Sequence, residues 1–140
     1  MITREADYAI RVILYLTDLP DKKLVSTMEI SEKMFVPYRF LRKIIRQLTE
    51  SGFVSSSKGK SGGVCLNKSP DEVSLYDVIE VFDQRGLMLN SCKQQDEECQ
   101  RREYCPVHKR LSTVQSKIDS LLRETRFSDL KNSDTPPGQT

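Results

Sequence analysis

Residues 37–66 read PYRFLRKIIRQLTESGFVSSSKGKSGGVCL, and they contain the strongest fold signals of the chain. The first part repeats large apolar side chains at helical spacing, which predicts a helix that begins at Pro37 and stops at Gly52. Residues 53–57 and 64–67 have the composition of two β-strands, and the Lys-Gly-Lys-Ser-Gly-Gly segment between them is a turn. The segment therefore predicts a helix followed by a β-hairpin with a flexible, cationic tip. The apolar stripe of the helix consists of Phe40, Leu41, Ile44, Ile45 and Leu48.

Basic side chains recur at intervals of three or four on the opposite face of this helix, and two more lie in the hairpin turn. In residues 37–60, six basic residues against Glu50 alone give a charge of +5, which leaves −3 for the rest of a chain of formal charge +2. Such a surface is typical of proteins that contact phosphate, although a solvated helix face would look similar by charge alone. The hairpin favours the DNA-binding interpretation. The candidate DNA-binding residues are Arg39, Arg42, Lys43, Arg46, Lys58 and Lys60.

The segments around this stretch complete a winged helix-turn-helix. Apolar spacing predicts a first helix over 3–18, and a capping-box pattern at Ser26 and Glu29 predicts a second helix that reaches about Met34. Ser74 is a start signal for a fourth helix that packs back on the domain. We therefore expect a mainly α protein with a small β-hairpin, whose DNA-binding domain covers residues 1–83. In such a fold the third helix enters the major groove of DNA, and the second helix crosses the DNA backbone. The hairpin turn reaches the adjacent backbone or the minor groove. The glycines of that turn match neither phosphate-loop nor dinucleotide-binding spacing.

Three cysteines lie close together in the polar segment 84–105, and a histidine follows them: Cys92, Cys99, Cys105 and His108. Thiolates with an imidazole are soft ligands that select zinc or an iron-sulfur cluster, so this segment is a candidate metal site. A structural zinc site is disfavoured because its cysteines usually come in tighter pairs. A thiol redox enzyme is disfavoured because no Cys-x-x-Cys is present. Cys65 lies apart and is interpreted as a small buried residue.

Residues 106–130 follow a three-four alternation of apolar residues that predicts a long helix with an apolar seam. A seam of this length needs a partner, and a two-fold homodimer is the economical solution. The seam residues are Leu111, Val114, Ile118 and Leu121. Residues 131–140 are rich in polar residues and proline and are expected to be disordered. No leader pattern follows Met1 and no apolar run approaches the roughly 20 residues of a membrane span, so we expect a cytoplasmic protein without membrane association.

Together these features resemble the bacterial winged-helix iron-sulfur regulators of the IscR and NsrR type over residues 2–130. The resemblance is carried by Asp7-Tyr8-Ala9, Phe40-Leu41, Ile44-Ile45, Gly52-Phe53-Val54, the turn 58–63, Leu75-Tyr76-Asp77-Val78-Ile79, the three cysteines and Cys105-Pro106-Val107-His108. It implies a homodimeric transcription regulator, expected to be a repressor and not an enzyme, that binds a double-stranded DNA operator. It also implies a [2Fe-2S] or [4Fe-4S] cluster on the three cysteines that controls DNA affinity.

The resemblance leaves the fourth ligand of the cluster open. His108 matches the histidine of the IscR branch, whereas Asp7 matches the first-helix aspartate that reaches the partner subunit's cluster in the NsrR branch. Six residues separate Cys92 from Cys99, one more than is common in the family, which leaves the cluster type open as well. The alternative is a winged-helix DNA-binding dimer with structural zinc or with thiol-based, cluster-free signalling.

Overall fold

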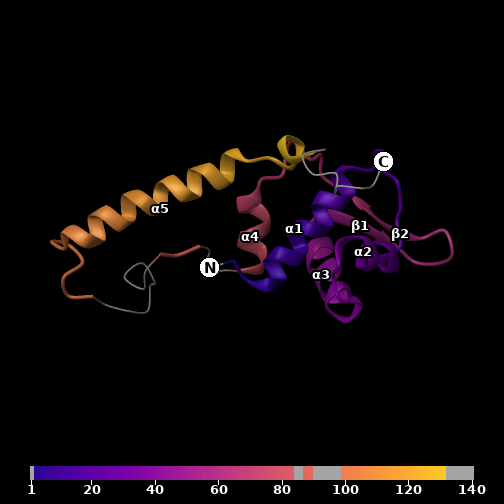
Figure 1. Cartoon of the computed structure of the whole chain (residues 1–140), viewed down its shortest axis with the longest axis horizontal. Helices are drawn as coiled ribbons and strands as arrows, with labels where there is room; N and C mark the ends of the chain where they lie inside the picture. The colour runs from indigo at the N-terminus through magenta and orange to yellow at the C-terminus, as the bar shows by residue number, and fades with distance from the viewer. Residues whose placement is uncertain (1, 84–86, 90–98, 132–140) are drawn as a thin grey trace.

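The computed structural model describes residues 2–83, 87–89 and 99–131 of the 140-residue chain. Short helices and a β-hairpin form a body, and one long helix extends away from it (Figure 1). The predicted fold class, mainly α with a small hairpin, is confirmed. In chain order the elements are α1 (Arg4–Thr17), α2 (Thr27–Met34), α3 (Tyr38–Glu50), β1 (Val54–Ser57), β2 (Gly63–Leu66), α4 (Leu75–Phe82), α5 (Pro106–Glu124) and the 3-10 helix η2 (Phe127–Leu130).

The body has one hydrophobic core, and α1 runs through its centre. Helix α1 contacts α2, α3, α4, β2 and η2, so its buried face meets every side of the domain. The predicted stripe of α3 lies against it: Leu41, Ile44 and Leu48 are almost fully buried, whereas Phe40 remains partly exposed. This packing leaves the opposite face of α3 on the surface.

The starts of α2 and α4 show how local polar contacts set the helix boundaries. Ser26 Oγ accepts the N–H of Glu29 at 3.1 Å, as predicted. The reciprocal half of the predicted capping box does not form there, because the Glu29 carboxylate accepts a hydrogen bond from the Tyr15 hydroxyl at 2.8 Å instead. The complete box occurs at Ser74, whose side chain and backbone exchange hydrogen bonds with Asp77 at 3.2 and 2.9 Å.

The hairpin is antiparallel, with Val54 opposite Leu66 and Ser57 opposite Gly63. It is joined to the body by Val25, whose N–H and C=O pair with the C=O and N–H of Val64 at 3.0 and 2.7 Å. Gly63 is required at this crossing because a Cβ there would lie 2.5 Å from the Val25 carbonyl oxygen. The turn at the hairpin tip therefore projects from a fixed base.

The C-terminal helix is shorter than the sequence predicted. Helix α5 ends at Glu124, and the chain then pairs with the start of α4: the Thr125 carbonyl accepts the Leu75 N–H at 3.0 Å. Phe127 donates its N–H to Val73 O at 3.1 Å, and its ring is fully buried in the core. Burial of this ring outweighs continuation of the helix, so α5 is attached to the body at its C-terminal end. Of the tail 131–140, predicted to be disordered, residues 132–140 lie outside the described residues.

Candidate nucleic-acid interface and metal centre

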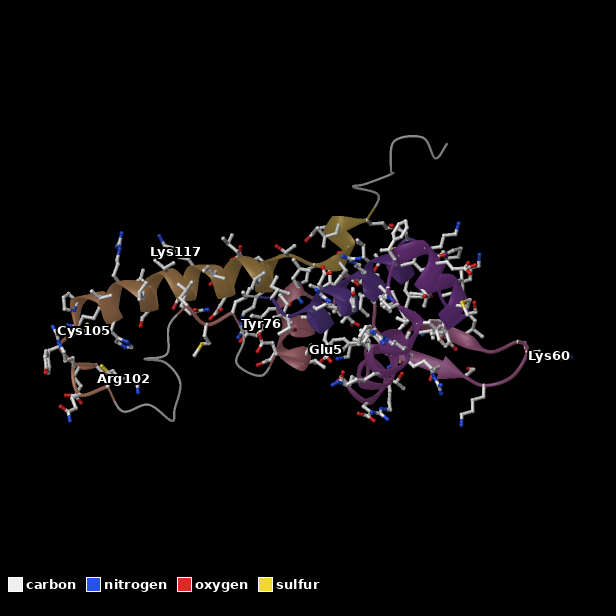
Figure 2. All side chains as sticks on the ribbon, turned by 60° about the horizontal axis from the view of Figure 1, so that its bottom comes forward. Glu5, Lys60, Tyr76, Arg102, Cys105 and Lys117 are labelled. Atoms are coloured by element: carbon white, nitrogen blue, oxygen red, sulfur yellow. The ribbon has the colours of Figure 1, made fainter. Side chains whose placement is uncertain are left out.

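An open groove of about 840 Å³ lies between the exposed face of α3 and the hairpin. Five of the six predicted DNA-binding residues line it, and Lys60 lies at the tip of the hairpin turn (Figure 2). The lining residues with polar or charged side chains are Thr27, Tyr38, Arg39, Arg42, Lys43, Arg46, Thr49, Glu50, Ser56, Ser57 and Lys58. The positive charge inferred from the sequence is therefore gathered on one concave surface.

The cations of this groove differ in what they contact within the chain. Lys43 Nζ lies 2.9 Å from Oε1 of Glu5 on α1, and Arg46 lies 4.0 Å from Glu50 on its own helix. Both pairs are exposed, so each contributes only about 0–1 kcal/mol and can be displaced by a competing phosphate. Within the described residues Arg42 makes no ion pair, which leaves its guanidinium available to a ligand.

The entry into α3 contains a residue that sequence reasoning missed. Tyr38 is the first residue of α3, is 43% exposed and lines the groove beside Arg39. All of the predicted DNA-binding residues are basic, so a tyrosine between a proline and an arginine was not among them. The signal that could have found it is its place at the N-terminal end of the helix predicted to enter the major groove, where side chains of such helices reach base edges. Pro37, predicted as the first helical residue, is the N-cap instead.

The described part of the cysteine segment meets α5 at its first turn. Cys105 is the N-cap of α5, and a hydrogen bond from the His108 backbone lowers the pKa of its thiol below the ordinary value, with smaller contributions from Val107 and Arg101. The half-buried His108 side chain has a buried Nδ1 without a hydrogen-bond partner. Cys99 is exposed. Thiolate character and an unused imidazole nitrogen are the chemistry that a soft metal requires.

The other predicted ligands are placed differently. Asp7 lies in α1 within the body, where its carboxylate pairs with Arg11 at 2.8 Å. Cys92 lies outside the described residues. In the described ranges, no three His, Cys, Asp or Glu side chains come together in the manner of a metal site. Figure 2 shows Cys105 at the outer end of α5, away from the body that carries Glu5.

One face of helix α5 contacts its own chain, and an apolar stripe of the helix remains exposed to solvent. Buried Gln115 accepts the Leu89 N–H and donates to Asp119, both at 2.9 Å, so it holds segment 87–89 against the helix. Val107 and Leu121, two heptads apart, are 62% and 65% exposed. Of the predicted seam, Val114 and Leu121 are exposed, and Leu111 and Ile118 are half-buried.

Comparison with known proteins identifies a family whose model matches most of this chain. The family model described as Rrf2, iron-dependent transcriptional regulator, matches residues 2–133. Among solved structures, CymR of B. subtilis, described as the global cysteine regulator, is 22% identical with a TM-score of 0.72, covering 96% of this chain and 98% of that one. The oxidized form of Staphylococcus aureus CymR is 18% identical, TM-score 0.75, covering 97% and 99%. IscR of T. potens is 19% identical, TM-score 0.68, covering 99% and 93%.

These structures share the fold of the chain over nearly its whole length, including the long C-terminal helix. At these identities the likeness concerns the fold alone. No helix of the described residues has both the length and the apolar character needed to cross a bilayer.

Proposed function

The chain belongs to the Rrf2 family of transcriptional regulators, and from this premise we propose that it is a homodimeric DNA-binding repressor controlled by an iron-sulfur cluster. Its family consists of regulators and not of enzymes. The observation that carries the proposal is the position of α5. Cys105 is the N-cap of this helix, and the residues after its end at Glu124 are joined to the body by the hydrogen bonds of Thr125 with Leu75 and of Phe127 with Val73. A structural change at the cysteines can thus be transmitted along α5 to the body that carries the proposed DNA-binding groove.

DNA binding is assigned to the groove between α3 and the hairpin. Arg39 and Arg42 have the donor geometry for guanine edges, and Lys58 with Lys60 supplies cations toward the flanking backbone or minor groove. A dimer presents two such grooves to two half-sites of an operator. The open apolar stripe of α5 supports a dimer in which the helices of two copies cover each other.

Cluster binding is assigned to Cys92, Cys99 and Cys105. The fourth ligand is His108 or Asp7 of the partner subunit. His108 is supported by its unpartnered buried Nδ1, and Asp7 by its place on α1, away from the outer end of α5 where Cys105 of the same chain lies. When bound, the group supplies a redox-sensitive and nitric oxide-sensitive link among the three thiolates. Its presence would clamp the cysteine segment against the start of α5.

Control requires that the cluster distinguish a DNA-competent from a DNA-incompetent arrangement, because a ligand with equal affinity for both shifts nothing. A cluster held by the cysteines would act at the first turn of α5, and the hydrogen bond between Leu75 and Thr125 joins the other end of this helix to α4. A change in the orientation of α5 would thereby alter the spacing of the two grooves in the proposed dimer.

The test is a Cys99→Ala variant whose DNA affinity is measured before and after anaerobic reconstitution with iron and sulfide. We expect the unaltered chain to change affinity on cluster loading and the variant to lose that response. Cys65→Ala, at a buried cysteine of the hairpin, is the matched control and should retain the response. A variant that responds like the unaltered chain would overturn cluster control through Cys99.

A second candidate is thiol-based signalling without a cluster. It is favoured by the exposed Cys99 and by the stabilised thiolate of Cys105, and one structure with the same fold is that of an oxidized CymR. A visible absorption spectrum with matched iron and sulfide supports the cluster. A colourless protein with unchanged metal content after reconstitution, whose DNA affinity responds to a thiol oxidant, supports the second candidate. Stoichiometric zinc supports a structural metal site.

A further inference from the structure

Phe35 has a conformation and an exposure that the fold does not explain. It ends α2 with φ 54° and ψ 44°, the left-handed region that bulky side chains rarely adopt. Its side chain is 84% exposed, so almost none of its apolar surface is removed from water within the chain. A glycine at this position would form the same turn without the steric penalty. The ring therefore costs stability and gains no burial in return.

Phe35 lies three residues before Tyr38, which lines the groove between α3 and the hairpin. The turn that Phe35 occupies leads through Val36 and Pro37 into Tyr38, the first residue of α3 and a lining residue of the groove. The turn is fixed: the Val36 N–H donates to Ser31 O at 3.2 Å and the Ser31 hydroxyl donates to Val36 O at 2.7 Å. Two exposed aromatic rings are thus held at the entry of the helix that carries the cations of the groove.

We propose that Phe35 and Tyr38 form an apolar contact of the DNA interface that packs on the C5 methyl groups of thymine. The inference deepens the proposed function and rests on it. The major groove presents one apolar feature, the thymine methyl, and aromatic or aliphatic side chains contact it. The neighbouring cations Arg39 and Arg42 recognise guanine and phosphate, so they supply no such readout. Because of this contact, operators with thymine next to the bases contacted by the arginines bind the protein more tightly.

The chemistry of this contact is distinguishable from that of the cations. Burying a methyl group contributes about 0.8 kcal/mol, which corresponds to about a fourfold change in affinity for each thymine contacted. The contact carries no charge, so its removal leaves the salt dependence of binding unchanged, whereas removal of a cation reduces it.

The probe is a duplex selected from a randomised pool with the full chain, prepared in two forms that differ only in uracil replacing thymine. Uracil keeps the base-pairing edge and removes the methyl group. We expect the unaltered chain to bind the thymine form about four- to tenfold more tightly. Phe35→Gly and Tyr38→Ala should each reduce that ratio, and Tyr38→Phe, which keeps the ring, should retain it. Comparison of variants on both duplexes cancels any effect of uracil on DNA shape.

Folding is separated from binding by a melting curve. Phe35→Gly should melt at the same temperature as the unaltered chain or higher, because it relieves the left-handed backbone. A Phe35→Gly or Tyr38→Ala variant that keeps the full thymine-to-uracil ratio overturns the assignment of that residue. A ratio near one for the unaltered chain overturns the inference while DNA binding stands. If no duplex is enriched from the pool, DNA reading by this chain fails and the inference falls with it.

Discussion

Lys43 on α3 and Glu5 on α1 form an ion pair at 2.9 Å, and Lys43 lines the groove between α3 and the hairpin. The pair connects α3 to α1, the central helix of the body, and it places a carboxylate beside a cation that could bind a phosphate. In the proposed DNA complex, a phosphate that binds Lys43 competes with the carboxylate of Glu5 for the same ammonium group.

Glu5→Gln should raise the affinity for DNA by about two- to fivefold at low salt, because an exposed ion pair contributes about 0–1 kcal/mol. Lys43 is then free to bind a phosphate, so the dependence of affinity on salt becomes steeper. Fluorescence anisotropy of a labelled duplex over a salt series measures both. Glu124→Gln, the same change at the C-terminal end of α5, is the control and should bind like the unaltered chain. A Glu5→Gln variant indistinguishable from that control would contradict the competition.

Arg42→Ala and Lys58→Ala should each weaken DNA binding. Arg42 makes no ion pair in the described part of the chain, and both residues line the groove. If either side chain binds a phosphate, its removal should reduce the salt slope by about one. If Arg42 reads a base, its removal should cost about 1–3 kcal/mol on the selected duplex. Lys117→Ala on α5 controls for the removal of one positive charge. Equal affinity of all three variants on the selected duplex would count against this groove as the interface.

The sequence predicted the winged helix well because its signals are local. The spacing of Leu41, Ile44 and Leu48 marks the buried face of α3, and the same periodicity places the cations opposite. The capping box predicted at Glu29 is only half confirmed, since a carboxylate that can cap its own helix accepts a hydrogen bond from a distant tyrosine. Such competition depends on tertiary packing and is invisible in a local pattern.

The C-terminal segment shows the same limit on a larger scale. The heptad pattern extends the predicted helix through residue 130, but Phe127 is buried in the core and the chain pairs with Val73. Burial of one large ring against residues about fifty positions earlier in the chain cannot be read from spacing. In the candidate metal site, Cys105 and His108 are neighbours at one helix start, as their spacing implies. The roles of Asp7, Cys92, Cys99, Cys105 and His108 as ligands stay predictions.

Phe127→Ala should lower the free energy of unfolding by about 3–5 kcal/mol, the usual cost of removing a large buried ring. The change also removes the anchor between α5 and the body, so any response of DNA affinity to the cysteines should shrink. Urea denaturation measures the first effect. Phe127→Leu retains most of the volume and should cost much less. A small destabilisation by the alanine variant would contradict the anchoring role.

Tyr15→Phe should lower the free energy of unfolding by about 1 kcal/mol at neutral pH, because it removes the hydrogen bond from α1 to Glu29. Burial, followed by that hydrogen bond and the Glu29 charge, raises the pKa of Tyr15 from 10.0 to about 12. The fold therefore favours the neutral phenol, and its contribution is present below pH 10 and lost as the pH rises toward 12.

The measurement for Tyr15 is denaturation of both proteins between neutral pH and pH 12. The stability difference between them should narrow over the upper two pH units, since only the unaltered chain has the phenol to ionise. A difference that stays constant over that range would show that the hydroxyl of Tyr15 is not held by Glu29 in solution.

The proposed function requires that a cluster on the cysteines set the DNA affinity of the groove at the other end of α5. The most direct measurement takes one anaerobic preparation of the full chain, with iron and sulfide quantified per chain, and determines its affinity for the selected duplex before and after the cluster is removed. Cluster control predicts visible absorption, matched iron and sulfide, and an affinity that changes about fivefold or more, as expected for a coupling of about 1–3 kcal/mol. Equal affinity with and without the cluster would contradict it.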